Sequence, residues 1–189
     1  YLLDAARENA HKNGFNGAQY PWESADDGSE QCPDWTIEPD GSCYRCYVAV
    51  YEHHVTAAVA YGIYDYVKIT GDIDFLYTKG AEILTETARF WASRCEYNNE
   101  QDRYEINQVT GPDEWHEPVN NNLYTNYLAR WNLKYVLSLL EVMKKEETSS
   151  YNELVEKTGL TEMETAKWKE VQEKIYLPRK EGTKLLEQF

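Results

Sequence analysis

Helical periodicity is the feature that most limits how this chain can fold. From residue 50 onward, apolar residues recur every three or four positions, which is the spacing of one face of an α-helix. The chain should also begin with the end of a helix, at residues 1–13, closed by the turn residues Asn13 and Gly14. Five further helices are predicted, at residues 50–69, 74–95, 121–144, 151–158 and 161–176.

Short connections join these predicted helices, so neighbouring helices should pack antiparallel in a bundle, a solenoid or an α/α barrel. No internal repeat of fixed period is present, which weakens the solenoid. One short β-hairpin is expected, because Tyr104, Ile106 and Val109 follow a strand rhythm and Asn98-Asn99 suits a turn. The sequence therefore predicts an all-α fold that includes one hairpin.

Two of the predicted helices carry a stripe of residues that should be buried, because its members repeat at helical spacing. The stripe in residues 50–69 is Val55, Ala58, Val59 and Gly62, and the stripe in residues 74–95 is Leu84, Thr87, Ala88, Trp91 and Cys95. The last helix should start with a capping box from Thr161 to Glu164 and end before Leu177-Pro178.

Residues 15–47 show no helical pattern, because glycine or proline interrupts them every few positions. A connection of this length inside a compact domain is usually functional or disordered. Its aromatic residues Tyr20, Trp22 and Trp35 indicate that it packs against the rest of the domain. We therefore expect a long functional loop here.

Composition narrows the class of protein. The net charge of −14 argues against nucleic-acid binding, which needs lysine and arginine to neutralise phosphates. No run of 18 apolar residues is present, so we expect no membrane span, and no signal peptide is apparent, so we expect a cytoplasmic protein. The 16 tyrosines and 6 tryptophans suit carbohydrate, because each offers a flat apolar face and a polar tip.

The four cysteines are Cys32, Cys43, Cys46 and Cys95. Cys43 and Cys46 have the spacing of half a zinc site, but no second pair accompanies them. We expect free thiols and no metal site; metal binding through Cys32, Cys43 and Cys46 is the alternative.

The segment "GPDEWHEPVNNNLYTNY", residues 111–127, carries more acid than a helix start needs. Gly111-Pro112 predicts a turn, and one of Asn120 to Asn122 can cap the next helix. Aromatic side chains alternate with the acids, so we expect the carboxyl groups to be partly buried, which raises their pKa. A carboxylic acid held protonated can donate a proton to a departing sugar oxygen. The alternative is a solvated acidic helix N-terminus.

Several segments together resemble the maltose and kojibiose phosphorylase family of glycoside hydrolases, family sixty-five. They are "NGFNGAQYPWESADDGSE", "YEHHVTAAVAYGIYDYVKITGDIDFL", "GAEILTETARFWASRCEY", "GPDEWHEPVNNNLYTNYLARWNL" and "GLTEMETAKWKEVQEKIYLP". The resemblance implies that residues 1–189 are the central part of a catalytic (α/α)6-barrel domain, truncated at both ends.

The same resemblance implies roles for individual residues. Glu114, in the family's G-P-D-E motif, corresponds to the general acid. Trp22 and Glu23 match the P-W-E-S segment that lies near the sugar, and Glu52, His53 and His54 match pocket-facing polar groups. Trp115, His116 and Asn121 are further candidates for binding the substrate, whereas Asp113 and Glu117 stay unassigned. For the two histidines the alternative is a structural pair at a helix start, one buried and one exposed.

The resemblance implies inverting phosphorolysis of an α-glucosyl disaccharide to β-glucose 1-phosphate. Inorganic phosphate is the co-substrate, no other cofactor is needed, and the full-length protein forms a homodimer. An inverting hydrolase related to acid trehalases is the first alternative, and it would need a second carboxylate to activate water. A non-catalytic carbohydrate-binding module is the second. The family's Lys-Gln sugar-binding pair, its phosphate-holding segment and its W-D-x-E segment are not in these residues, so we expect this piece alone to be inactive.

Overall fold

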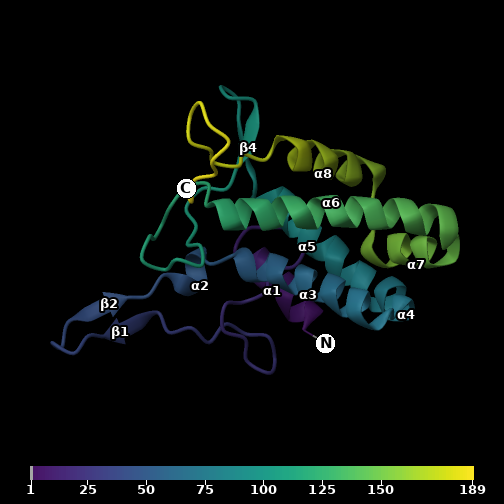
Figure 1. Cartoon of the computed structure of the whole chain (residues 1–189). Coiled ribbons are helices and arrows are strands. Elements are labelled where there is room, and N and C mark those ends of the chain that lie inside the picture. Colours follow the sequence, from purple (N-terminus) through teal and green to yellow (C-terminus); the bar gives the residue numbers. More distant parts are fainter. Residues whose placement is uncertain (1) are drawn as a thin grey trace.

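The computed structural model describes residues 2–189, and helices dominate it (Figure 1). Its helices are α1 (Leu3–Lys12), α2 (Val48–Tyr51), α3 (His54–Thr70), α4 (Ile73–Phe75), α5 (Ala81–Arg94), α6 (Leu123–Glu146), α7 (Thr148–Thr158) and α8 (Glu162–Lys174), with a π-helical turn at Leu76–Gly80. The strands form two antiparallel hairpins, β1 (Trp35–Ile37) with β2 (Cys43–Arg45) and β3 (Glu96–Asn98) with β4 (Arg103–Glu105). The prediction of an all-α fold is confirmed.

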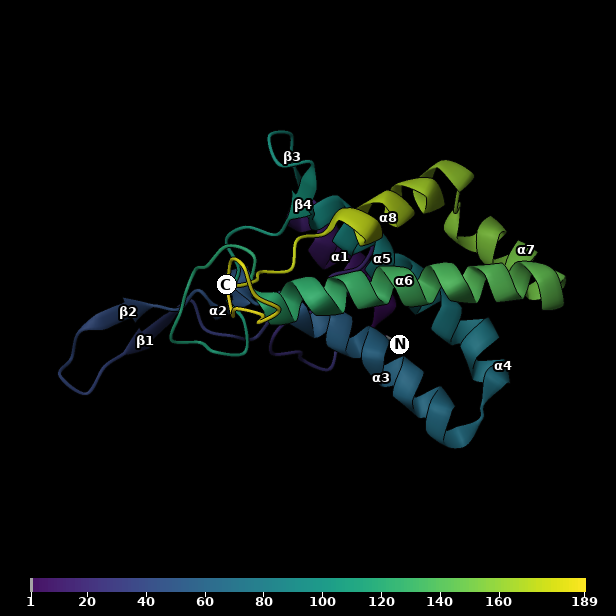
Figure 2. The ribbon, with the colours of Figure 1, turned by 45° about the horizontal axis from the view of Figure 1, so that its top comes forward.

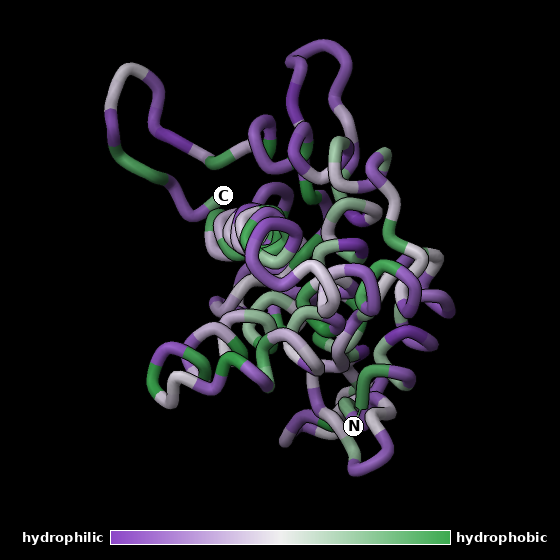
Figure 3. Tube along the Cα trace, turned by 90° about the vertical axis from the view of Figure 1, so that its right-hand side faces the viewer, coloured by the Kyte–Doolittle hydropathy of each residue, from purple (hydrophilic) through white to green (hydrophobic). Residues whose placement is uncertain are grey.

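The core lies where α5 and α6 pack together, with α3 and α8 on either side of α6 (Figure 2). Large buried side chains such as Trp91 of α5, Leu133 of α6 and Trp168 of α8 fill it. In Figure 3 the projecting loops are mostly hydrophilic, whereas hydrophobic stretches gather where helices face one another. None of the helices in residues 2–189 has the length and apolar content needed to cross a bilayer.

The buried stripe predicted for α5 is confirmed for Leu84, Thr87, Ala88 and Trp91, which are all buried, whereas its last member, Cys95, is half-buried. The stripe predicted for α3 is wrong. Ala58 and Gly62 are exposed, and Val55 and Val59 are only half-buried. The buried face is instead His54, Thr56, Ala57, Ala60, Ile63 and Val67. Small residues occur on several faces of this helix, so the faces differ little in hydrophobicity. The spacing of these residues could therefore not determine which face packs against α5 and α6.

Most predicted boundaries agree with the structure to within about three residues, including the hairpin of β3 and β4 and the capping box of α8. Two helices are interrupted. The chain leaves helical geometry at Glu52 and His53, between α2 and α3, and it forms the π-helical turn between α4 and α5.

The hairpin of β1 and β2 was not predicted, because all six strand residues are exposed and show no alternation of burial. It projects from the helices in both views (Figures 1 and 2). Trp35 on β1 is 60% exposed, so the expectation that it packs down is wrong, whereas Tyr20 and Trp22 are half-buried.

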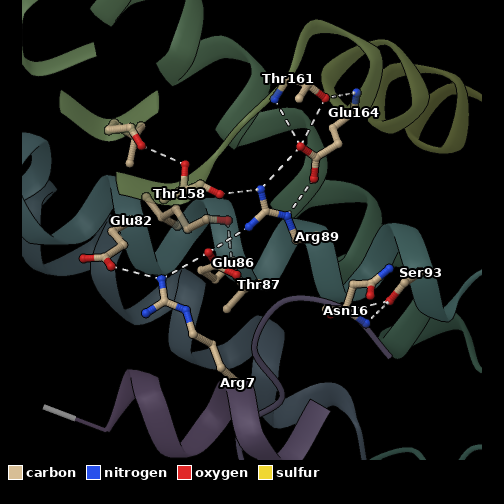
Figure 4. A network of polar contacts seen from close by, with 12 residues as sticks. Arg7, Asn16, Glu82, Glu86, Thr87, Arg89, Ser93, Thr158, Thr161 and Glu164 are labelled. Carbon is tan, nitrogen blue, oxygen red and sulfur yellow. Dashed lines mark hydrogen bonds and ion pairs between the residues drawn. The ribbon is translucent and has the colours of Figure 1, made fainter. Parts of the chain in front are cut away.

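A network of charged side chains ties α1, α7 and α8 to α5 (Figure 4). Arg7 of α1 contacts Glu82 and Glu86 of α5 at 3.0 and 3.1 Å. Arg89 of α5 contacts Glu86 at 2.8 Å and Glu164 of α8 at 2.7 Å. It also donates to the carbonyl oxygen of residue 158 at the end of α7. The first helix and the last two helices are therefore attached to one central helix.

The segment leading to Trp22 passes very close to α5. The N–H of Ala18 donates to the carbonyl oxygen of Glu86 at 3.0 Å. Gly17 has a φ of +78°, and a Cβ there would lie 2.2 Å from that same oxygen. Glycine is needed at this position both for the backbone angle and for the close approach.

Candidate functional site

The loop of residues 111–119 is fixed at its base by backbone contacts. Val109 and Val119 exchange two hydrogen bonds of 2.9 and 2.8 Å, and the N–H of Thr110 donates to the carbonyl of Tyr51 at 3.0 Å. A Cβ on Gly111 would lie 2.3 Å from the side-chain nitrogen of Asn122, so only glycine fits there. The loop therefore leaves and returns at defined points beside the start of α3 and α6.

Asn122 caps α6. Its Oδ1 accepts a hydrogen bond of 3.1 Å from the N–H of Thr125, which satisfies one of the free donors at the helix start. The predicted asparagine cap is confirmed. Asn121, a candidate for binding the substrate, has a left-handed φ of 58°, and its Oδ1 accepts from the N–H of Ile106 and from the amide of Asn126. That side-chain oxygen holds the loop in place.

Glu114 lies at the exposed part of the loop and makes no hydrogen bond with any residue from 2 to 189. Trp115 beside it is 94% exposed. The expected partial burial is wrong for Glu114, because the indole of Trp115 points to solvent and does not cover it, whereas Asp113 and Glu117 are half-buried. Glu114 is therefore free to contact a ligand from solvent.

The neighbours of Glu114 are engaged with other segments. Asp113 lies 2.7 Å from Nδ1 of His116 and accepts from the amide of Gln188 at 2.9 Å. These hydrogen bonds, that from Gln188 foremost, lower the pKa of Asp113. The hydroxyl of Tyr44, on β2, donates to the carboxylate of Glu117. The loop is thus contacted both by the C-terminal segment and by the projecting hairpin.

Glu52 is the buried carboxyl group of this region. Its side chain lies between α2 and α3, the residue is 2% exposed, and neither carboxylate oxygen has a hydrogen-bond partner among residues 2–189. Burial foremost, together with the negative charges of Glu114 and Glu117, raises its pKa to about 8. The property expected of Glu114, a carboxyl held protonated at neutral pH, is therefore found at Glu52.

Sequence reasoning grouped Glu52 with pocket-facing polar residues but did not identify it as buried. The available signal was its position directly after the apolar run "VAVY" and directly before a helix.

Both histidines of the "EHH" segment are buried, so the alternative of one buried and one exposed is wrong. The ring of His54 meets Trp22 and Tyr124 edge-on, with centroids 5.6 and 5.5 Å apart, and its Nε2 lies 3.7 Å from Glu52. Burial lowers its pKa. His54 thus brings Trp22, Glu52 and Tyr124 together at the start of α3 and α6.

His53 faces away from this group. Its Nδ1 accepts from Nε of Arg94 at 3.1 Å, its Nε2 lies 2.9 Å from the carbonyl oxygen of Val50, and it packs against Phe15 and Phe90. Burial lowers its pKa to about 3, so the ring is neutral. The structure gives His53 a packing role and separates it from its neighbour.

The segment of Trp22 and Glu23 is organised by Glu30, which sequence reasoning missed. The carboxylate of Glu30 accepts from the N–H groups of Trp22 at 2.7 Å, Glu23 at 3.0 Å and Cys32 at 3.0 Å. Three backbone donors on one carboxylate fix the course of the loop. Glu23 itself is exposed. The signal that could have identified Glu30 is its place after the acidic turn "DDGS".

All four cysteines are free, as predicted. Within residues 2–189 the structure brings no three histidine, cysteine or acidic side chains together in a group that could hold a metal. Among residues 2–189 the contact between two sulfur atoms joins Cys32 to Cys46 at 3.8 Å, not the Cys43 and Cys46 pair that the spacing suggested.

Comparison with known proteins decides the family. The model of the glycosyl hydrolase family 65 central catalytic domain matches residues 1–189. The chain belongs to glycosyl hydrolase family 65. Its helices are accordingly part of an (α/α)6 barrel.

Two curated family 65 relatives illustrate the similarity. A kojibiose phosphorylase of Caldanaerobacter subterraneus subsp. tengcongensis is 54% identical over 100% of this chain and 24% of the relative. An alpha,alpha-trehalose phosphorylase of Thermoanaerobacter brockii is 40% identical over 94% of this chain and 21% of the relative.

A solved structure of a protein from the human microbiome, assigned as a kojibiose phosphorylase, superposes with a TM-score of 0.83. It is 29% identical, and the match covers 99% of this chain and 25% of that one. The family 65 chain described here therefore spans about a quarter of the length of the relatives it matches.

Proposed function

We propose that the protein containing this chain catalyses inverting phosphorolysis of an α-glucosyl disaccharide, with Glu114 as the general acid. The observation that carries the proposal is the placement of Glu114. It is an exposed carboxyl without a partner among residues 2–189, on a loop fixed at its base, close to the buried group of Trp22, Glu52 and His54. Membership of family 65, whose relatives include kojibiose and trehalose phosphorylases, supports it.

In the proposed reaction, inorganic phosphate attacks the anomeric carbon from the face opposite the leaving sugar. Glu114 donates its proton to the departing oxygen, and the configuration is inverted to give β-glucose 1-phosphate. Phosphate is already an anion, so the reaction needs no general base. The aromatic face of Trp22, held edge-on to His54, suits stacking against a sugar ring. No metal or organic cofactor takes part in this scheme.

Hydrolysis is the competing reaction, and it requires an ionised second carboxylate to activate water. The carboxyl groups around Glu114 are Asp113, Glu117 and Glu52, and Asp113 is engaged by His116 and Gln188. With a pKa of about 8, Glu52 holds its proton at neutral pH and is a poor base. Glu117 is occupied by the hydroxyl of Tyr44. The neighbourhood of Glu114 therefore favours phosphorolysis.

The decisive experiment incubates the full-length protein with kojibiose, nigerose, trehalose and maltose, each with and without phosphate. Proton NMR of the product mixture identifies the anomer that forms first. The proposal expects turnover only with phosphate, with β-glucose 1-phosphate as the first product. Release of free glucose without phosphate would instead establish the hydrolase.

The proposal also includes a homodimeric full-length protein in the cytoplasm, as the family resemblance implies. Size-exclusion chromatography with light scattering measures the mass of the assembly, and a monomer at micromolar concentration would reject the dimer. Cell fractionation tests the location.

A further inference from the structure

Two half-buried cysteines lie at the base of the projecting hairpin. Cys32 comes just before β1 and Cys46 directly after β2, and their sulfur atoms are 3.8 Å apart. The backbone beside them is already paired, because the N–H of Cys46 donates to the carbonyl of Asp34 at 2.8 Å and Trp35 pairs with Arg45. The hairpin thus holds the two sulfurs together without a covalent bond.

A disulfide requires the sulfurs to approach from 3.8 Å to a bond length of about 2.05 Å. Rotation of the Cys32 and Cys46 side chains, which are adjacent in space, can supply a movement of this size. Burial, together with the adjacent thiol of Cys46, raises the pKa of Cys32 to about 11. Because the two sulfurs are in contact, either can attack an oxidant first and the other can then complete the disulfide.

We propose that Cys32 and Cys46 form a redox-active dithiol that low-molecular-weight disulfides, such as oxidised glutathione, convert to a disulfide. One thiol of the pair releases its proton to solvent, its sulfur attacks one sulfur of the oxidant, and one glutathione thiolate leaves. That thiolate takes up the proton of the second thiol, whose sulfur then attacks the first. The second glutathione leaves as a thiolate and takes up a proton from solvent. Two electrons pass from the protein to the oxidant, and two reduced glutathione molecules form for each disulfide.

The location of the pair connects it to the candidate site. The N–H of Cys32 binds the carboxylate of Glu30, which also holds the backbone of Trp22 and Glu23. On the other side of the pair, Tyr44 of β2 contacts Glu117 in the loop of Glu114. A bond between Cys32 and Cys46 therefore links these two contact systems and restricts how far the hairpin can move from the loop of Glu114. This consequence for catalysis rests on the proposed function, whereas the chemistry of the dithiol does not.

The chemical test uses the reduced full-length protein, titrated with mixtures of reduced and oxidised glutathione, quenched by alkylation and digested for mass spectrometry. The expected product is a peptide pair joined through Cys32 and Cys46, formed reversibly and restored to two thiols by a reductant. A stable glutathione adduct on Cys46 or a bond between Cys43 and Cys46 would overturn the proposal. So would two unchanged thiols in excess oxidant.

Matched variants separate the pair from the other cysteines. Cys43→Ser removes an exposed thiol on β2, and Cys95→Ser removes a thiol whose pKa burial raises to about 12. Both variants should still form the cross-link with the parent's dependence on oxidant. Cys32→Ser should accumulate the mixed disulfide at Cys46, because the resolving thiol is absent. Failure of both Cys32→Ser and Cys46→Ser to form a mixed disulfide at the remaining thiol would contradict the proposal.

Hydrogen exchange tests the structural consequence without reference to activity. Amides of residues 33–45 should exchange more slowly in the oxidised than in the reduced parent, and the difference should vanish in Cys32→Ser. Phosphorolysis is then measured on both redox forms, with a change in KM for the disaccharide expected only in the parent. An inactive full-length protein that forms the cross-link rejects the proposed function alone, and an active one that does not form it rejects the dithiol.

Discussion

The carboxylate of Glu52 lies 3.7 Å from Nε2 of His54, and both side chains are buried at the start of α3. Burial raises the pKa of Glu52 to about 8 and lowers the pKa of His54. At neutral pH the two groups are therefore both uncharged. They form a polar but uncharged pair, and the ring of His54 packs against Trp22 and Tyr124.

Glu52→Gln is expected to stabilise the full-length protein more at pH 8 than at pH 5. Folded Glu52 keeps a proton up to a pKa of about 8, whereas its ordinary value is 4.5. Folding stability of the parent therefore falls as pH rises through this window, by on the order of 2–4 kcal/mol. Glutamine has no proton to lose, so the difference in melting temperature between variant and parent should widen with pH. Glu156→Gln, at an exposed position of α7, is the control and should show no widening.

Glu114→Gln is expected to lower kcat/KM for the disaccharide by about 10²–10⁴-fold, the range for loss of a general acid. Activity toward α-glucosyl fluoride and phosphate should fall far less, because fluoride leaves without full protonation. Glu117→Gln, on the same loop, should lower kcat/KM by less than about 10²-fold with either substrate. An equal loss on both substrates in Glu114→Gln would show that the residue does not act as the acid. Unchanged turnover with retained sugar binding would favour the non-catalytic binding module.

Gly111→Ala is expected to destabilise the protein by about 1–3 kcal/mol, the range for overpacking. The new Cβ would meet the side chain of Asn122 at 2.3 Å and displace the cap of α6. Gly62→Ala is the matched control, since nothing lies within 4 Å of its Cβ position in the exposed middle of α3. That variant should be neutral or stabilised by about 0.5–1 kcal/mol. Thermal unfolding of both variants compares them directly, and a tolerated Gly111→Ala would contradict the close approach.

Arg89→Met should destabilise the protein by on the order of 2 kcal/mol. The change leaves Glu86 and Glu164 without their contacts of 2.8 and 2.7 Å, and Glu86 is largely buried. Lys144→Met removes a contact of 3.7 Å between exposed groups of α6 and α8 and should change stability by less than about 0.5 kcal/mol. Melting temperatures in low and high salt measure both effects, and similar values for the two variants would refute the importance of the network.

The helices could be predicted from sequence because their signals are local. The capping box at Thr161 and the cap at Asn122 depend on residues only three positions apart, and the stripe of α5 contains large side chains whose burial is unambiguous. The face of α3 could not be predicted, because its stripe is built from small residues that resemble one another on every side.

The chemistry of the candidate site was only partly accessible from sequence, because burial depends on segments that are distant along the chain. Glu114 has aromatic neighbours in sequence, yet its indole neighbour points to solvent. Glu52 has two histidine neighbours, yet it lies close to Glu114 and Glu117, more than sixty positions later. The role of Glu30 could not be predicted either, because its hydrogen-bond partners are backbone N–H groups, which every residue type except proline carries.

The contact between Tyr44 and Glu117 has a consequence for engineering. The loop of Glu114 is held at its base by Val109 and Val119, and the hairpin of β1 and β2 touches it from outside. A chimera that transplants residues 111–119 from a relative with another substrate preference would keep a hairpin selected for a different loop. Transplants that exchange residues 33–45 together with the loop should transfer the donor's preference more completely than either segment alone.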